Sequence, residues 1–200
     1  MTFLAVRVLA IVATTAMTVA TVWADEIDDE AGDRYRQTMA ELCSDVPIVE
    51  PEVHTIKYPD PVAGSGAMAT ARIYQFFCFS GAYNAAFVFF THSEFGGVQQ
   101  LFFAVPAFDV ACQEGLEAGM DCVPVDIAVT GMTTVGELVN PEFDPATRTI
   151  TSLICWRGLC DASERGIWVF EDGRFVLRAY EVDAAYNGEI DLTRIVDFTP

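Results

Sequence analysis

The sequence predicts an all-β domain: an antiparallel meander or curled sheet, of sandwich or barrel form, with one short helix near the N-terminus. From Met68 onward, short segments rich in β-branched and aromatic residues alternate with turn residues. Asp172 and Gly173 separate two of these segments, and Asp-Gly is a strong signal for a two-residue hairpin. Almost no helical periodicity follows residue 68, and the turns are local, which favours a meander.

Residues Met1 to Ala24 have the pattern of a signal peptide. Arg7 is the only charged residue before Asp25, and an apolar stretch starts at Val8. The three residues that end at Ala24 fit the small–x–small rule for signal peptidase. The alternative is an uncleaved anchor, but a bilayer span needs about 20 apolar residues, and threonines interrupt this shorter stretch. We therefore expect a periplasmic or secreted protein with no stable membrane anchor after cleavage.

The segment after Ala24 links the signal peptide to the β domain. Its first six residues, 25–30, hold five carboxylates and are predicted to form a loose acidic leader. Gly32 can begin a short helix that continues through Leu42. Residues 44–67 are rich in proline and glycine, which predicts an irregular connection with at most short strands around Val53–Tyr58. The predicted organisation is signal peptide 1–24, leader with helix and connection 25–67, and β domain 68–200.

The strands of the β domain are bounded by turn residues. Pro106 is expected to end one strand, and Asn140-Pro141 and Asp144-Pro145 supply turns. The last strand, from Ile190, is expected to lie at an edge of the sheet. The predicted strands cover residues 72–79, 82–90, 98–105, 123–129, 134–139, 148–155, 166–170, 174–180 and 190–198.

The chain is strongly acidic, with 11 Lys and Arg against 29 Asp and Glu and a net charge of −18. Removal of residues 1–24 takes away one arginine and no carboxylate, so the mature chain is more acidic still. This charge repels nucleic acid phosphates and anionic lipids, so nucleic acid is not an expected partner. It favours a basic envelope protein as a partner. The simpler alternative is a solvated acidic surface, which many secreted proteins have.

Six cysteines in an exported chain predict structural disulfides. The spacing favours Cys155 with Cys160, which would lie opposite each other across a four-residue loop of a hairpin. It also favours Cys112 with Cys122, which bracket a loop that holds glycine and glutamate. Cys43 and Cys78 remain, and their pairing would tie an N-terminal segment onto the sheet. Other pairings stay open, because spacing only ranks them.

The sequence holds no constellation that predicts a catalytic or metal site. No C-x-x-C motif is present, and His54 and His92 are the only histidines, which argues against a metal or redox centre. The motifs of P-loop, EF-hand and serine hydrolase sites are absent as well. No cofactor is therefore expected, and a non-catalytic protein is favoured over an enzyme.

Trp156 and Arg157 are the candidate interaction residues. They lie between Cys155 and Cys160 in a chain that is poor in arginine. A loop tip that carries tryptophan and arginine is typical of a protein-binding anchor. The alternative is that Arg157 pairs with a local carboxylate such as Asp161.

Several short blocks in this chain resemble one family. They are Cys78-Phe79-Ser80-Gly81-Ala82-Tyr83-Asn84-Ala85, then residues 140–150 (NPEFDPATRTI), 156–161 (WRGLCD) and 166–175 (GIWVFEDGRF). The blocks are similar to those of exported bacterial proteins gathered as domain of unknown function 1176. The resemblance covers about residues 74–182 and consists mostly of turn and core positions.

The resemblance implies an exported β domain and names no reaction, ligand or catalytic residue. Two departures concern cysteines. Cys160 stands where the family has its second glycine before Asp161, and the chain lacks the late cysteine that members often carry after the last strand. The first departure supports a local Cys155–Cys160 bridge, and together they weaken transfer of the family's own pairing.

These observations favour an exported binding or interaction module without catalytic activity. A more specific version is an inhibitor of a basic envelope hydrolase such as lysozyme. Electrostatic steering would bring the acidic chain to the cationic cleft of that enzyme. A carboxylate-dependent envelope hydrolase is the alternative, and it requires a buried carboxyl with a raised pKa in a cleft. A purely structural envelope protein is a third hypothesis, and it predicts self-association.

Overall fold

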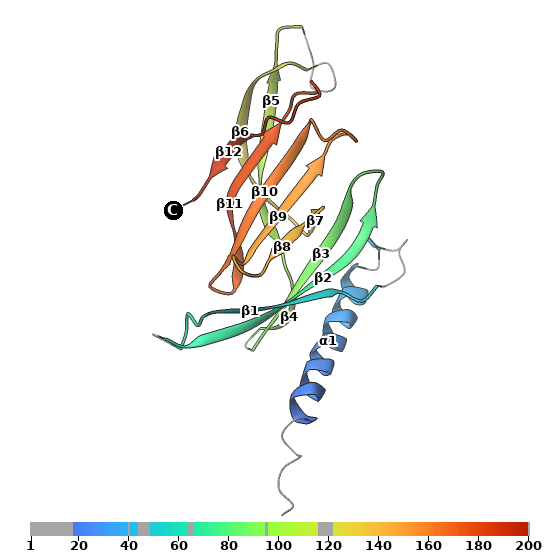
Figure 1. The fold of residues 1–200 in the computed structure, drawn as a ribbon, viewed down its shortest axis with the longest axis vertical. Helices are drawn as coiled ribbons and strands as arrows, with labels where there is room; N and C mark the ends of the chain where they lie inside the picture. The colour runs from blue at the N-terminus through green and yellow to red at the C-terminus, as the bar shows by residue number, and fades with distance from the viewer. Residues whose placement is uncertain are drawn as a thin grey trace, which may run out of the picture.

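Figure 1 shows the computed structural model, which describes residues 18–39, 41–43, 49–63, 66–94, 96–115 and 122–199. The predicted signal peptide lies outside the described residues as far as residue 17. The helix is α1 (Thr18–Met39), and the strands are β1 (Glu52–Pro59), β2 (Met68–Ser80), β3 (Ala85–Ser93), β4 (Gly97–Gln100), β5 (Phe103–Cys112), β6 (Pro124–Val135), β7 (Glu137–Val139), β8 (Glu142–Asp144), β9 (Thr149–Cys155), β10 (Ser163–Glu171), β11 (Arg174–Asp183) and β12 (Thr193–Asp197).

The strands form two five-stranded sheets and a two-stranded ribbon. The first sheet has the order β1-β2-β3-β4, with β7 also paired to β3. The second sheet has the order β12-β11-β10-β9-β8, and β5 and β6 form the ribbon (Figure 1). All pairings in both sheets and the ribbon are antiparallel, and the sheets do not close into a barrel. The predicted antiparallel all-β fold is confirmed.

The two sheets and the ribbon share one hydrophobic core. Ile73 and Phe89 of the first sheet, Phe103 of the ribbon and Trp168 of the second sheet are all buried in it. The Trp168 and Phe103 rings meet edge to face, 5.5 Å between centroids. Trp168 Nε1 donates a hydrogen bond to the backbone oxygen of Ala104 at 2.8 Å, which satisfies the buried indole. This bond also anchors the ribbon to the second sheet.

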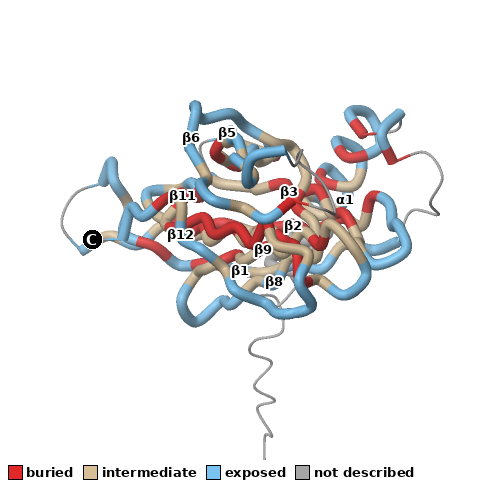
Figure 2. Tube along the Cα trace, turned by 90° about the horizontal axis from the view of Figure 1, so that it is seen from above, coloured by how far each residue is buried: buried red, intermediate tan, exposed pale blue. Residues whose placement is uncertain are grey.

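Helix α1 covers the face of the first sheet that points away from this core, and Figure 2 shows it beside β2 and β3. Because side chains alternate along a strand, β2 presents Ile73 to the core and Phe76 to the helix. The Tyr35 ring stacks on Phe76 with 4.5 Å between centroids, and its hydroxyl donates to the Phe77 backbone oxygen at 2.9 Å. Met39 completes the contact one turn further on.

The helix is longer than predicted, and residues 25–30 are helical rather than a loose leader. Asp28 explains the difference, because its carboxylate accepts hydrogen bonds from Arg72 at 3.0 Å and Tyr74 at 2.9 Å on β2. Such tertiary contacts stabilise helical segments that sequence alone leaves marginal. The helix ends at Met39, so Leu42 lies beyond it and is 51% exposed. No helix among the described residues is long and apolar enough to cross a membrane.

The short strand expected around Val53–Tyr58 is confirmed as β1, which pairs with β2 along its whole length, from Glu52 opposite Gln75 to Pro59 opposite Met68. One further difference concerns strand β5, which runs through Pro106, although this residue was expected to end a strand. The ribbon has only two strands, so β5 needs backbone N–H donors only on the side that faces β6. Proline, which has no N–H, is tolerated in such an edge strand.

All six cysteines form disulfides: Cys43–Cys78, Cys112–Cys122 and Cys155–Cys160. These are the three pairs that the spacing favours. Cys43–Cys78 fixes the chain just after α1 to β2, and Cys112–Cys122 closes the tip of the ribbon. The predicted Asp172–Gly173 hairpin is confirmed between β10 and β11, with both φ angles positive, 47° and 82°.

Two asparagines join the first sheet to the end of β9. Asn84 donates to the Cys155 backbone oxygen at 2.9 Å, and its own side-chain oxygen accepts the Cys155 N–H at 3.2 Å. Asn140, at a positive φ of 43°, accepts the Ala85 N–H at 2.8 Å and donates to Leu153 O at 3.0 Å. The two side chains also contact each other. They therefore fix the position from which the Cys155–Cys160 loop starts.

Candidate functional site

The loop between β9 and β10 carries the predicted interaction residues. Its ends are closed by the Cys155–Cys160 disulfide and by a hydrogen bond from the Trp156 N–H to the Ala162 oxygen at 2.8 Å. Inside it, the Cys160 N–H donates to the Arg157 oxygen at 2.9 Å, and Cys160 has a positive φ of 58°. The loop is a tight turn with fixed backbone bonds, so its side chains are presented in defined directions.

Arg157 pairs with a carboxylate of its own chain, as the alternative interpretation supposes, and its side chain is 31% exposed. Its Nε donates to Asp161 Oδ1 at 2.6 Å, and a second guanidinium nitrogen contacts the other carboxylate oxygen. The guanidinium also lies over the Tyr186 ring, 5.2 Å from the centroid. Arg157 therefore positions Tyr186 and is not a free anchor at the loop tip.

Asp161 connects this loop to the segment between β11 and β12. Its carboxylate is almost fully buried, and it also accepts the Gly188 N–H at 2.7 Å. The hydrogen bonds from Arg157 lower the pKa of Asp161 to about 2 and outweigh the opposing effect of burial. Asp161 is therefore ionised at neutral pH and holds two loops together.

This ion pair predicts a loss of stability in acid. The pKa of Asp161 is lower in the folded chain than in the unfolded chain, so its contribution is present above about pH 4 and is lost as the pH falls toward about 2. We expect Asp161→Asn to lower the melting temperature at neutral pH and to flatten its fall between about pH 4 and about pH 2. Thermal melts over this range measure the effect. Asp109→Asn, at an exposed carboxylate, should keep the original slope, and parallel curves for the parent chain and Asp161→Asn would contradict the assignment.

Trp156 is fixed by a second set of contacts. Its Nε1 donates to Glu164 Oε1 at 2.8 Å, and the other oxygen of Glu164 accepts the Tyr180 hydroxyl at 2.6 Å. Burial and the adjacent Glu164 carboxylate raise the pKa of Tyr180. The Trp156 ring lies 6.2 Å from Tyr186, between centroids. Both aromatic rings are therefore oriented without any ligand.

Trp156 and Tyr186 form part of a cleft of about 470 Å³, which we call the aromatic cleft. The ribbon supplies one side, and the loops that follow β9 and β11 supply the other. In Figures 1 and 2 the ribbon runs along one face of the second sheet, which brings these segments together. The residues that line the cleft are Phe108, Asp109, Val110, Cys122, Trp156, Ala184 and Tyr186.

The rim of the aromatic cleft is acidic. Asp109 is exposed and makes no hydrogen bond or ion pair with any residue that the structure describes. A neighbouring groove of about 490 Å³ shares Ala184 and adds the carboxylates of Asp126, Asp183 and Asp191. Aromatic walls beside carboxylates suit a cation carried on an apolar stem.

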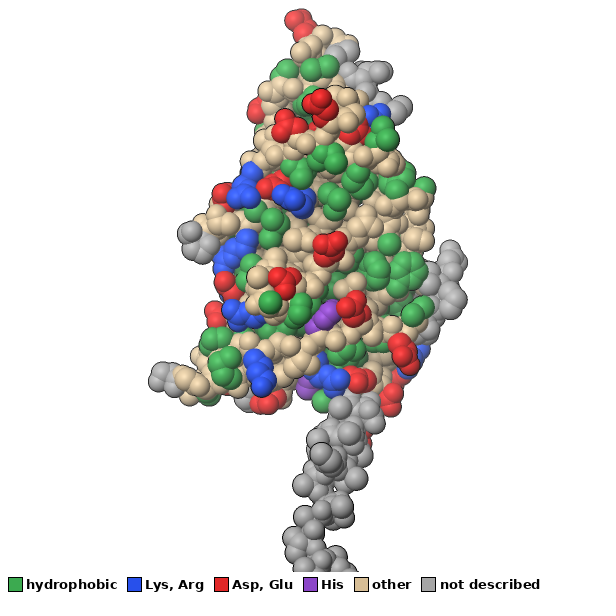
Figure 3. All heavy atoms as spheres, viewed as in Figure 1, with side chains coloured by type: hydrophobic (Ala, Val, Ile, Leu, Met, Phe, Trp, Pro, Cys, Tyr) green, Lys and Arg blue, Asp and Glu red, His purple; other side chains and the backbone are tan. Residues whose placement is uncertain are grey.

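Three arginines of the second sheet pair with carboxylates of the same sheet. Figure 3 shows Lys and Arg side chains gathered along the left side of the face that it draws, where this sheet lies. Arg165 and Arg194 both pair with Glu181, and Arg178 pairs with Glu171. Arg194 also lines the neighbouring groove, so the carboxylates there have one arginine of this sheet beside them.

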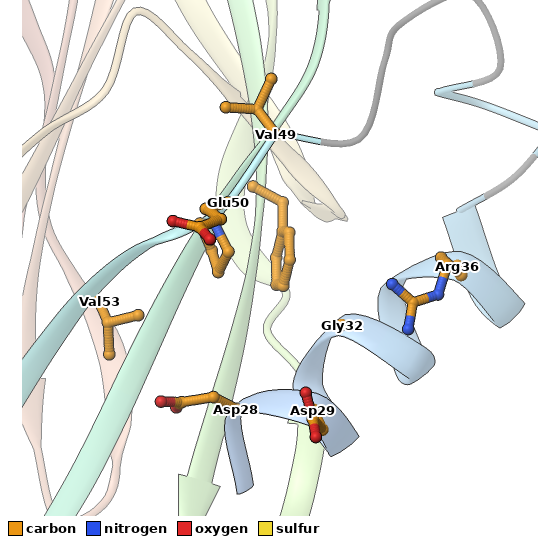
Figure 4. Close-up of a pocket in the computed structure, with 9 residues that line it drawn as sticks. Asp28, Asp29, Gly32, Arg36, Val49, Glu50 and Val53 are labelled. Atoms are coloured by element: carbon orange, nitrogen blue, oxygen red, sulfur yellow. The ribbon is translucent and has the colours of Figure 1, made fainter. Parts of the chain in front are cut away.

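A further cleft, of about 400 Å³, lies between α1 and the residues before β1 (Figure 4). Two of its four charged side chains have partners within the chain. Asp28 is bound by Arg72 and Tyr74, and Arg36 pairs with Asp33. This cleft is therefore a weaker candidate for ligand binding.

Two buried carboxyls, Glu181 and Asp161, have lowered pKa values. In Glu181, burial raises the pKa, but hydrogen bonds from Arg165 and Arg194 outweigh it, and the net shift is downward. Asp161 shifts downward as well. A general acid requires the opposite shift. No group of three or more potential metal ligands occurs among the residues described, and His54 packs against Phe143 at 4.5 Å between centroids.

The family model described as Protein of unknown function (DUF1176) matches residues 67–188. The chain belongs to this family. The predicted resemblance is thus confirmed, and the DUF1176 segment contains β2 to β11, Asn84, Asn140 and the whole aromatic cleft. Helix α1 and strand β1 lie outside it. No curated protein and no solved structure matches the chain significantly.

Sequence reasoning located Trp156 but missed Tyr186, Phe108 and Asp109. These residues lie far apart in the chain and show no common pattern. Only the packing of the ribbon against the second sheet brings them to one cleft. Cys122, which also lines the cleft, gave a weak indication of the site, because its predicted disulfide fixes that end of the ribbon.

Proposed function

We propose that this protein is an exported, non-catalytic binding module whose aromatic cleft takes a basic side chain of a partner protein. The observation that carries the proposal is the cleft itself: Trp156 and Tyr186 are held in place beside the unpaired carboxylate of Asp109. The signal-peptide pattern of residues 1–24 and the three disulfides support export, because disulfides persist in oxidising compartments.

The chemistry of the partner follows from the walls of the cleft. Lysine and arginine side chains have apolar stems that pack on aromatic rings and charged heads that pair with carboxylates. The molecule offers a precedent, because the Arg157 guanidinium already lies 5.2 Å from the Tyr186 ring. A net charge of −18 adds long-range attraction for a basic protein. Inhibition of a basic envelope hydrolase such as lysozyme is the specific form of this proposal.

The test is a titration of lysozyme, and separately of an oligoarginine peptide, into the oxidised chain. We expect binding to both probes, reduced lysis by lysozyme, and weaker binding at higher salt. Asp109→Asn should weaken binding about fivefold, since it removes a carboxylate from the rim of the cleft. Glu94→Gln removes the same charge at an exposed position in the turn after β3 and should have a much smaller effect.

Three outcomes would overturn parts of this proposal. Unchanged lysis at micromolar protein would remove the inhibitor form. An absence of binding to either probe at low salt would remove the basic partner. Equal effects of Asp109→Asn and Glu94→Gln would show that only the overall charge matters and not the aromatic cleft.

A further inference from the structure

Strand β6 of the ribbon has an edge that no described strand covers. It pairs with β5 on one side only, and β5 itself is anchored to the second sheet through Trp168. Near its start, β6 lies beside β12 across the groove that both strands line. Beyond that groove, the seven consecutive residues from Ala128 to Thr134 are all exposed. A strand with an open edge presents unpaired backbone donors and acceptors, which can pair with another strand.

This edge lacks the charges that most other outer strands carry. From Ile127 to Gly136 the chain has no charged residue, in a protein of net charge −18. Soluble proteins place charges or proline on exposed edges to prevent pairing between molecules. Three outer strands follow this rule: β1 holds Glu52, Lys57 and Pro59, β8 holds Glu142 and Asp144, and β12 holds Arg194 and Asp197. Strand β4 is uncharged as well, but it is only four residues long.

The edge also carries exposed apolar side chains. Met132 is 49% exposed, and Phe102, just before β5, is 60% exposed. The Phe102 ring lies beside Gly136, since a Cβ built on that glycine would be 3.5 Å from it. A bulge at Thr130 bends the strand and divides the edge. The straight part is therefore Gly131–Val135, with Phe102 next to its end.

We infer that Gly131–Val135 pairs antiparallel with the same segment of a second copy of this chain. The two ribbons would then form one four-stranded sheet across a twofold axis near Thr133, with Met132 of each copy opposite Thr134 of the other. This register places no carboxylate against another carboxylate. A basic peptide fits this edge poorly, because the segment offers no acidic side chain to pair with it.

This inference is independent of the proposed function and has the opposite dependence on salt. Two copies of an acidic chain repel each other, so salt should strengthen their association by screening. Binding of a basic partner at the aromatic cleft should weaken under the same change. The two proposals can therefore fail separately.

The experiment is sedimentation velocity of the oxidised chain over a range of concentrations, at about 50 mM and about 500 mM salt. We expect a reversible dimer, twice the mass of one chain, that is tighter at the higher salt. Met132→Lys should weaken dimerisation at least about tenfold, because a lysine on an edge strand opposes pairing. Leu159→Lys is the matched control: it adds the same charge at an exposed apolar loop residue and should leave the dimer intact.

Amide hydrogen exchange locates the contact. Peptides that cover residues 131–135 should exchange more slowly as the concentration of the chain rises, whereas peptides from β1 should not change. A chain that stays monomeric at every protein and salt concentration would overturn the inference. The edge of β6 would then be available to a strand of another protein. Open-ended polymers, or equal effects of Met132→Lys and Leu159→Lys, would also overturn it.

Discussion

Replacement of Gly166 by alanine is expected to lower the free energy of unfolding by about 4 kcal/mol. Gly166 and Trp168 lie on the same face of β10, and the indole covers the glycine. A Cβ at position 166 would lie 2.5 Å from Cζ3 and 2.7 Å from Cζ2 of that ring. Real Cβ atoms do not approach other atoms this closely, so the ring must move.

Movement of Trp168 has several costs at once. The ring is 1% exposed, so it has no free space to enter. It would lose its edge-to-face contacts with Phe103 and Tyr180, and its hydrogen bond to Ala104 O. The last loss would leave a buried donor without a partner, which alone costs about 1–3 kcal/mol.

Chemical denaturation, with near-ultraviolet circular dichroism as a probe of Trp168, measures this effect. Gly131→Ala is the matched control, because it is also a strand glycine, yet a Cβ there would have nothing within 4 Å. Dilute protein keeps any association through β6 out of the measurement. A Gly166→Ala chain as stable as Gly131→Ala, or with an unchanged tryptophan signal, would contradict the packing.

Removal of the Cys43–Cys78 disulfide should cost about 4 kcal/mol of stability, close to the effect of Gly166→Ala. The bridge closes a loop of 35 residues, and the loss of chain entropy in the unfolded state grows with loop length. The double substitution Cys43→Ala and Cys78→Ala removes the bridge without leaving a free thiol. It should also raise hydrogen exchange in the last turns of α1, where Tyr35 and Met39 pack on the first sheet.

The comparison is with the double substitution Cys112→Ala and Cys122→Ala. That bridge closes only 10 residues, so its loss should cost about 3 kcal/mol. It lies at the tip of the ribbon, away from α1, and should leave hydrogen exchange in the helix unchanged. If the Cys43–Cys78 variant is the more stable of the two, loop entropy is not the dominant effect of these bridges.

Local signals in the sequence were sufficient for much of the fold. Asp172-Gly173 fixes the hairpin of β10 and β11, because a two-residue turn there needs positive φ angles that these residues tolerate. The two short-range disulfides followed from spacing, since their cysteines face each other across small loops. In each case the physical cause lies within about ten residues of chain.

The failures have long-range causes. Residues 25–30 are helical because Asp28 binds two side chains of β2, and no pattern within the segment reveals that contact. Strand β5 passes through Pro106 because the ribbon has a partner on one side only. Both results depend on how the elements are arranged in space. No local pattern in a single sequence gives that arrangement.

The candidate site shows the same division. Spacing marked Trp156 and Arg157 as unusual, and the structure places both at the aromatic cleft or behind it. Asp161 and Tyr186 engage Arg157 from within the chain. A role of Trp156 or Arg157 in binding a partner stays a prediction. Tyr186 reaches this position only through the fold of the segment after β11, which has no recognisable motif.

Cleavage of the predicted signal peptide would change the N-terminal end of α1. The predicted cleavage point, after Ala24, lies inside α1, whose first turn holds no acidic residue. Cleavage there would place Glu26, Asp28 and Asp29 near a new helix N-terminus, where the backbone dipole stabilises each carboxylate by about 0.3–1 kcal/mol. Among the side chains that the structure describes, packing of the helix on the sheet starts at Ile27, beyond the cut. The acidic residues that lie inside the intact helix would then lie in the first turns of the trimmed one.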